Sequence, residues 1–362
     1  MMVQRKGFTL IELLIGSAIM LVVVIGALTV YSRSNKISVD QNQYAELQHD
    51  VRSAMYLMMR DIRMVGAGLP VEFNMYGLEG WDNESQGATV QPDRLRIMGN
   101  MEDPLHIVIQ SYSGGVGGGA ANAELIDFSL EQYPYPDEYY VFKTALILPN
   151  PASGCREGAI RTITHVTHSA TGGNEKMNFS PGLAPGINPP GGLVSDGGCA
   201  AADWTGGVIV FVNVLEYWLD VTGSMAGLTA GVNGYLGIPD VLYVTKNAVH
   251  FPLAQNVENF QLQYNGDLDE DGQLDGFRDW DANWTLDDVG RIRQIRAWIL
   301  GRTPNPFIGL GGQPPNDIHH YRRPLIANSP AAIDDDNHRR FLLESTANIR
   351  NMSLNLYNRG ER

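Results

Sequence analysis

Near its beginning the chain reads Arg5-Lys6-Gly7-Phe8-Thr9-Leu10-Ile11-Glu12-Leu13-Leu14, so that a basic pair and a glycine lead directly into an apolar run. The run covers residues 8–31 and contains one charged residue, Glu12. An apolar helix of about 20 residues crosses the hydrocarbon core of a bilayer, which is about 30 Å thick. We therefore expect a transmembrane helix over 8–31. Residues 1–7 would form a cytoplasmic leader, because Arg5 and Lys6 favour that side.

Glu12 is the feature of this run that a plain membrane anchor leaves unexplained. A carboxylate inside a membrane helix costs about 2.5–3.5 kcal/mol on insertion scales, so it usually marks a function and a partner. A cleaved secretory signal peptide is a second interpretation. Its apolar core would be only about 7–15 residues long and would precede a small-x-small cleavage site. Residues 26–31 offer no good site of that kind.

A third interpretation comes from a resemblance. The segment Lys6-Gly7-Phe8-Thr9-Leu10-Ile11-Glu12 resembles the class III signal of type IV prepilins and type II secretion pseudopilins. The resemblance implies cleavage between Gly7 and Phe8 by a prepilin peptidase, and N-methylation of Phe8. It also implies a single pass through the inner membrane with a periplasmic head, and later a place in an extracellular filament beside other major and minor pilins or pseudopilins.

The physical chemistry of Glu12 fits that implication. Cleavage would create a new cationic amine at Phe8, at the membrane surface. In a filament, Glu12 of one subunit can pair with the Phe8 amine of its neighbour, because both charges would otherwise be stranded among apolar helices. We expect such a pair to set the axial register of the subunits more than it adds stability.

The helix is expected to continue beyond the membrane as an amphipathic segment, 32–66. Between Ser32 and Met64 the sequence has neither proline nor glycine. Apolar residues recur at helical spacing: Leu47, Val51, Ala54, Met55, Met58, Ile62 and Val65. Gly66, Gly68 and Pro70 are stop signals. A single helix from Phe8 to about Met64 would be about 85 Å long.

The remaining residues, 67–362, are expected to form a β-rich globular head. Short β-branched or alternating runs recur through it: 95–97, 106–111, 139–148, 159–166, 207–218, 241–245, 257–264, 292–300 and 341–354. The runs do not alternate with helical segments as in βαβ units. The pattern therefore predicts an α+β fold, in which a long N-terminal helix packs on a head of antiparallel sheet.

Several head motifs are similar to those of the large minor pilins of the PilW type, which are related to the J-type pseudopilin of type II secretion. They are Asp61-Ile62-Arg63, Leu242-Tyr243, the segments 257–262 and 292–300, and Arg339-Arg340-Phe341 followed by Ile349-Arg350-Asn351. This resemblance implies a minor pilin, in an initiating or tip complex of a type IV pilus. A type II secretion pseudopilin and a pilus-associated adhesin stay open as alternatives.

Composition and motifs argue against two classes of function, nucleic-acid binding and catalysis. The formal net charge is −14, from 26 basic and 40 acidic residues. An acidic head does not attract nucleic acid phosphates, but it suits divalent cations. No Ser/His/Asp, Cys/His or paired-acid arrangement for catalysis is legible. We therefore expect a structural subunit that is not an enzyme.

One acidic segment has the spacing of a calcium loop. Asp267, Asp269, Asp271 and Asp275 occupy positions 1, 3, 5 and 9, Gly272 occupies position 6, and Gln273 at position 7 would offer its backbone carbonyl. Position 12 holds Arg278 in place of the bidentate glutamate of an EF-hand. The segment predicts a calcium ion that stabilises the head. The alternative is a solvated Asp/Gly turn.

The chain contains two cysteines, Cys155 and Cys199. The N-terminal signal would place them outside the inner membrane, where disulfides form and persist. Closing a loop of about 45 residues stabilises a fold by about 4 kcal/mol in the chain-entropy model. We expect a Cys155–Cys199 disulfide. The alternative is a pair of buried free thiols.

Overall fold

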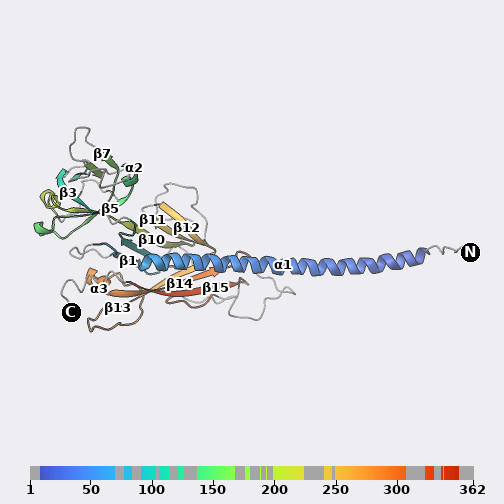
Figure 1. The fold of residues 1–362 in the computed structure, drawn as a ribbon. Coiled ribbons are helices and arrows are strands. Elements are labelled where there is room, and N and C mark those ends of the chain that lie inside the picture. Colours follow the sequence, from blue (N-terminus) through green and yellow to red (C-terminus); the bar gives the residue numbers. More distant parts are fainter. Residues whose placement is uncertain are drawn as a thin grey trace, which may run out of the picture.

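The fold is built on one helix of 53 residues, α1 (Leu10–Ile62). The computed structural model describes residues 9–69, 77–83, 91–102, 106–113, 121–125, 137–167, 176–179, 188, 193, 199–223, 240–246, 249–306, 323–329, 336 and 338–349. Figure 1 shows α1 as a rod whose N-terminal half projects from the head. The helix ends two residues before Met64, and turns over 63–68 follow it. Gly66 and Gly68 have φ values of 73° and 65°, a conformation that glycine adopts without strain.

Three antiparallel sheets make up the described part of the head. The five-stranded sheet has the order β1 (Leu78–Trp81), β2 (Arg94–Gly99), β10 (Asn213–Asp220), β11 (Val241–Lys246), β12 (Val249–Gln255). The three-stranded sheet has the order β13 (Val257–Gly266), β14 (Ile292–Arg302), β15 (Arg340–Asn348). The seven-stranded sheet has the order β6 (Ala159–Thr162), β5 (Thr144–Leu148), β9 (Val208–Phe211), β3 (His106–Ser113), β4 (Ala121–Leu125), β8 (Lys176–Phe179), β7 (His165–Thr167).

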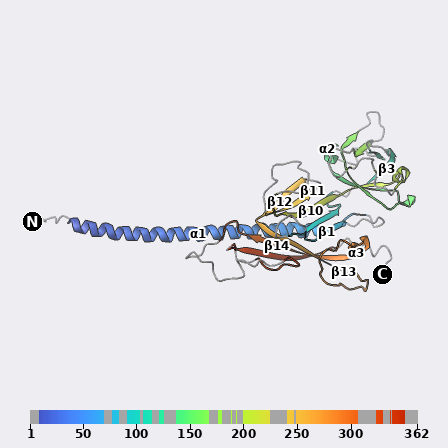
Figure 2. The ribbon, with the colours of Figure 1, turned by 180° about the vertical axis from the view of Figure 1, so that it is seen from behind.

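The C-terminal half of α1 lies between the five-stranded and the three-stranded sheets (Figures 1 and 2). Its apolar stripe and the facing strands form one hydrophobic core. Val51, Met58 and Ile62 are fully buried in it. The approach is close at Gly301 of β14, where a Cβ atom would lie 2.6 Å from Leu47 Cδ1. The amphipathic period of the helix therefore meets two sheets at once, and burial of this apolar surface holds the head on the helix.

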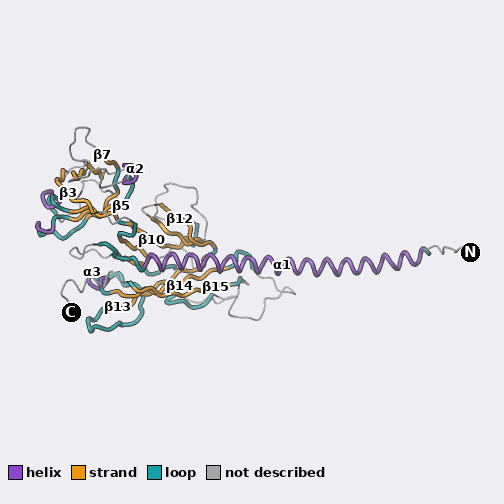
Figure 3. Tube along the Cα trace, in the orientation of Figure 1, coloured by secondary structure: helices purple, strands orange, loops and turns teal. Residues whose placement is uncertain are grey.

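The seven-stranded sheet has a hydrophobic core of its own. Trp204 and Phe179 are nearly fully buried there, together with Cys199. This core does not include residues of α1. Figures 1 and 3 show its strands at the end of the head away from the N-terminus, and two short elements, α2 (Asp137–Tyr140) and η3 (Ala201–Trp204), accompany them.

The α+β class and the antiparallel head predicted from the sequence are confirmed. The run 139–148 was expected as one strand, which is wrong. Tyr139 and Tyr140 end α2, and Phe142 at φ 67° turns the chain before β5 begins at Thr144. The run 207–218 contains two strands, β9 and β10, which belong to different sheets. Strands β1, β4, β8 and β12 were not predicted. They are short, or lack a strict apolar alternation.

A polar contact fixes α1 against the five-stranded sheet. Tyr217 of β10 donates its hydroxyl proton to Asp61 Oδ2 at 2.7 Å, and Arg60 Nε donates to Asp61 Oδ1 at 2.8 Å. Asp61 and Tyr217 are both buried. Burial and the adjacent Asp61 carboxylate raise the pKa of Tyr217, so its hydroxyl stays protonated as a donor. Because Asp61 lies in the last turn of the helix, one residue before its end at Ile62, the contact sets the position of α1 along the sheet.

We predict that Tyr217→Phe lowers the free energy of unfolding by about 1–3 kcal/mol, because it leaves a buried carboxylate oxygen without its donor. Denaturant unfolding of the detergent-solubilised full chain measures this. Tyr56→Phe is the matched control, since Tyr56 lies on the same helix but is 70% exposed. Equal stabilities of the two variants would show that the contact is unimportant.

Asp93 joins the two sheets that enclose α1. It lies just before β2, and its N–H donates to Phe260 O of β13 at 2.9 Å. In return Leu262 N donates to Asp93 Oδ2 at 2.6 Å, and Asn83 N donates to Oδ1 at 3.0 Å. Burial raises the pKa of Asp93 to about 8, although the two backbone donors oppose the shift. The folded state therefore favours a protonated Asp93 at neutral pH.

This raised pKa predicts a pH dependence. The unfolded carboxyl titrates near 3.8 and the folded one near 8. The group thus contributes its full stabilisation below about pH 4, and loses it as pH rises through 8. We predict that the melting temperature of the full chain falls from pH 5 to pH 8, and that Asp93→Asn flattens this slope whatever it does to absolute stability. An unchanged slope in the variant would contradict the assignment.

Candidate functional site

The N-terminal half of α1 is the largest apolar surface in the described part of the chain. The large apolar side chains between Leu10 and Tyr31 are exposed, by 82% at Leu10 and still by 43% at Val24. The most apolar window of the helix has none of its residues buried, and by length and composition it can cross a membrane. The head residues that enclose the second half of α1 thus leave the first half bare. This surface requires lipid or other helices to cover it.

Glu12 has a local role that was not predicted from the sequence. Thr9 is the N-cap of α1, and its N–H and its hydroxyl both donate to Glu12 Oε2 at 2.9 Å. Glu12 N donates in return to Thr9 Oγ1 at 3.3 Å. This is a capping box, and its signal, Thr-x-x-Glu before an apolar run, is legible in the sequence. Both bonds from Thr9 end on Oε2, so a further donor can approach the other carboxylate oxygen, Oε1.

The other residues of the expected processing site, Gly7 and Phe8, lie outside the described residues. The structure therefore leaves their cleavage and methylation as expectations. What it adds is the position of Glu12, in the first turn of the exposed half of α1. A carboxylate there also complements the positive end of the helix dipole.

The acidic loop brings together three of the residues expected to bind calcium. Carboxylate oxygens of Asp267, Asp269 and Asp271 lie within 4.8 Å of one another. Backbone N–H groups shape the turn, since Gly272 N donates to Asp267 Oδ2 at 3.0 Å and Gln273 N donates to Asp271 Oδ1 at 2.8 Å. Gly272 has φ 85°, which permits the sharp turn at position 6.

Asp275 does not belong to that group of three. Its Oδ2 accepts from Leu268 N at 2.9 Å and lies 3.4 Å from Arg278 Nη2. The residue at position 12 is thus a cation that binds the carboxylate of position 9. Glu270 likewise pairs with Arg291 at 2.8 Å. These two ion pairs neutralise part of the charge, whereas the Asp267, Asp269 and Asp271 carboxylates remain clustered.

The donor set fits a hard cation. It consists of carboxylate oxygens, which calcium prefers. Asp267 Oδ1 is buried and has no hydrogen-bond partner among the described residues, so a cation would satisfy it. The loop also has a firm base, because Asp275 N donates to Gly266 O at 3.0 Å and Gly276 N donates to Asn265 Oδ1 at 3.0 Å.

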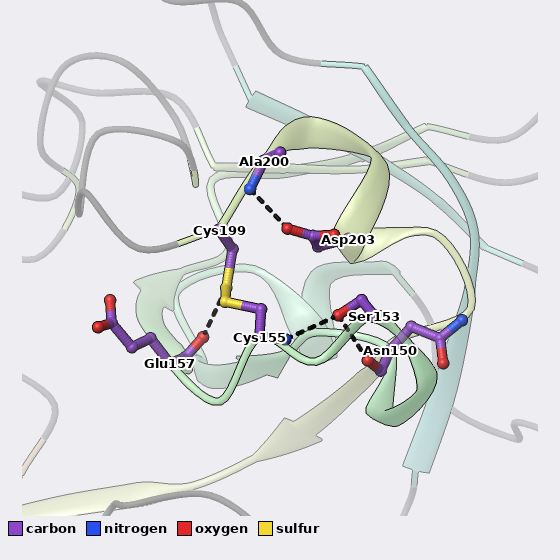
Figure 4. Close-up of a disulfide and its surroundings, with 7 residues drawn as sticks. All are labelled: Asn150, Ser153, Cys155, Glu157, Cys199, Ala200 and Asp203. Carbon is purple, nitrogen blue, oxygen red and sulfur yellow. Dashed lines mark hydrogen bonds between the residues drawn. A yellow bond between two sulfur atoms is a disulfide. The ribbon is translucent and has the colours of Figure 1, made fainter.

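Cys155 and Cys199 are joined by a disulfide, with their Cα atoms 5.7 Å apart. Figure 4 shows the bond between the loop after η1 (Pro151–Ser153) and the start of η3. Ser153 Oγ accepts from Cys155 N at 3.2 Å, and Asp203 accepts from Ala200 N at 2.7 Å, so both ends of the bridge are held locally. The pairing expected from the sequence is present, and it fastens η3 to the core of the seven-stranded sheet.

Comparisons with known proteins bear on the N-terminal segment. Residues 2–28 match the family model of the prokaryotic N-terminal methylation motif. A search of curated proteins finds no match. Among solved structures, a type IV-like pilin from Thermus thermophilus is similar over 84% of this chain and 97% of its own, with 9% identity and a TM-score of 0.31. A likeness at that score does not bear on the fold or on function, so the motif carries the comparison.

Proposed function

We propose that this chain is a pilin-type subunit that is cleaved between Gly7 and Phe8, N-methylated at Phe8, and assembled into a filament through α1. The observation that carries the proposal is that the methylation motif of residues 2–28 leads directly into a helix with an exposed apolar first half. The same helix is locked into a folded head by its second half. These features together support a structural subunit with a membrane-spanning helix. Its head would lie in the periplasm until assembly.

Glu12 would act twice in this scheme. In the single subunit it caps α1 through Thr9. In the filament its carboxylate would also accept from the Phe8 amine of the neighbouring subunit. An unpaired charge in that apolar environment is costly, so a subunit out of register would be disfavoured. The substitution Glu12→Gln separates the two roles. Glutamine can still form the capping box, but it carries no charge that could pair with the amine.

The finer assignment concerns the type of filament. The similarity of the head motifs to minor pilins of the PilW type supports an initiating or tip complex of a type IV pilus. A type II secretion pseudopilin is the alternative that shares the same signal and helix. The seven-stranded sheet, with its own core and its disulfide, adds a compact unit far from the membrane. A unit in that position could contact an external surface, which would support the alternative of a pilus-associated adhesin.

We predict three different outcomes for changes at the N-terminus. Replacing Gly7 with glutamate blocks processing, so the full-length precursor accumulates in the membrane. Glu12→Gln is processed and keeps the helix cap, yet its incorporation into sheared filaments falls by about tenfold because the charge pair is lost. Thr9→Ala removes the cap, at a cost of about 0.5–2 kcal/mol, but leaves the charge.

Immunoblots of membrane and filament fractions measure these outcomes. Normal incorporation of Glu12→Gln would contradict the charge pairing. A stronger defect in Thr9→Ala than in Glu12→Gln would show that the cap is the decisive role of Glu12. Val23→Ala is a control on the exposed apolar surface, since it changes neither the cap nor the charge.

We further propose that the loop 267–275 binds calcium through Asp267, Asp269 and Asp271, with the backbone of Gln273 and, after Arg278 moves aside, Asp275 as further ligands. The unpartnered Asp267 Oδ1 supports this proposal. Calcium would remove the repulsion among the clustered carboxylates. Because Trp280 and Trp284 pack on Tyr264 at the base of the loop, with ring centroids 5.1 and 6.0 Å from it, an ordered loop would stabilise that part of the head.

We predict that millimolar calcium raises the melting temperature of the full chain relative to a chelator, because a ligand that binds only the folded state stabilises it. Asp267→Asn should abolish the shift. Asp287→Asn, which lies outside the cluster of three carboxylates, should retain it. Equal melting temperatures in calcium and chelator for the unmodified chain would leave the loop as a solvated turn.

A further inference from the structure

The exposed face of the second half of α1 carries a stripe of cations. Arg52, Tyr56, Arg60 and Arg63 recur every three or four residues, which places them on one face of the helix. All four are exposed, and Tyr56 is exposed by 70%. We call these four residues the cationic stripe. It faces away from the core that α1 shares with the two sheets.

The composition of the stripe differs from that of an ordinary solvated helix face. It contains arginine, and the sequence has no lysine between Lys36 and Lys143. Arginine binds carboxylates through two parallel bonds, and arginine and tyrosine are enriched where proteins bind one another. The internal contacts leave the charges accessible. Arg52 lies over the ring of Phe341 at 5.3 Å, and Arg60 pairs with Asp61 while its side chain stays 59% exposed.

The complementary surface occurs on the same molecule. Residues 267–288, which we call the acidic apex, contain nine carboxylates and one arginine. Figure 1 shows β13 and α3 (Leu286–Gly290), which bound this segment, in the part of the head away from the N-terminus. Calcium in its loop would cancel only two of these charges. Two exposed leucines, Leu274 at 47% and Leu286 at 53%, provide apolar contacts among the acids.

We propose that the cationic stripe of one copy binds the acidic apex of a second copy of this chain, a contact that rests on the proposed assembly through α1. The two patches are different surfaces, one on the flank of the helix and the other at the tip of the head. Such a heterologous contact does not close into a symmetric dimer, so it can join two copies of this chain wherever they are neighbours in the filament. Guanidinium groups meet carboxylates in it, and Tyr56 meets the exposed leucines.

The arrangement agrees with parallel helices that are staggered along the filament. The apex of a subunit nearer the membrane would reach the flank of the subunit ahead of it. Attraction between a positive stripe and a negative apex also guides the approach and rejects copies that would bring like charges together. The contact would fix the axial register of neighbouring subunits at the level of the head, as the Glu12 pair would fix it at the level of the membrane.

Crosslinking in cells tests the contact directly. A full-length chain with Tyr56→benzoylphenylalanine is co-expressed with a tagged full-length chain in which Tyr56 is intact, and the membrane and filament fractions are irradiated. The expected product joins position 56 to a peptide within 267–288 of the tagged copy. Crosslinks to lipid alone, to a different subunit, or to another part of the tagged copy would overturn the proposal.

Charge reversal tests the chemistry of the contact. Arg63→Glu in the crosslinking copy should lower the yield by about tenfold, and Asp287→Arg in the tagged copy should restore it. Lys36→Glu is the matched control, because it makes the same charge change on the same helix outside the stripe and should leave the yield unaltered. An unaltered yield with Arg63→Glu would contradict the proposal. If Glu12→Gln still impaired incorporation, assembly through α1 would stand without this contact.

Discussion

The structure depends on one constraint: α1 is a single helix with two halves that need different surroundings. The second half lies between two sheets, where Val51, Met58 and Ile62 are fully buried. The first half has no cover within the described chain, and its apolar side chains are exposed. Water is a poor solvent for that surface, whereas a bilayer or a bundle of like helices is a good one. The fold therefore holds one end of α1 firmly and leaves the other for a membrane or for neighbours.

The contacts around the second half of α1 fix the helix in the head. Asp61 and Tyr217 join α1 to the five-stranded sheet, and Asp93 joins that sheet to β13. Gly301 lets β14 approach Leu47 closely. Because these contacts fix the helix relative to both sheets, a force or displacement applied to one reaches the other. Contacts of Glu12 in the first half of α1 and of the cationic stripe in its second half would then fix the same axial register between neighbouring copies.

Much of this arrangement is legible in the sequence, because long periodic segments determine it. The helix, its buried stripe and its end near Gly66 follow from spacing and from glycine and proline alone. The disulfide follows from the compartment that the signal implies. Spacing did not reveal that the seven-stranded sheet has a core apart from the one around α1, because this depends on which strands pair over long distances. It also gave no sign that Arg278 binds Asp275. The capping box of Thr9 and Glu12 has a signal in the sequence, Thr-x-x-Glu before an apolar run.

The identity of the mature N-terminus tests the central claim most directly. Mass spectrometry of the chain extracted from membranes and filaments would determine its first residue and any modification. The account predicts a chain that begins at Phe8 and carries one methyl group on its amine. A chain that begins at Met1 or Met2, or one cleaved beyond the apolar run, would contradict it. In the first case α1 is an ordinary anchor, and in the second its first half is absent from the mature protein.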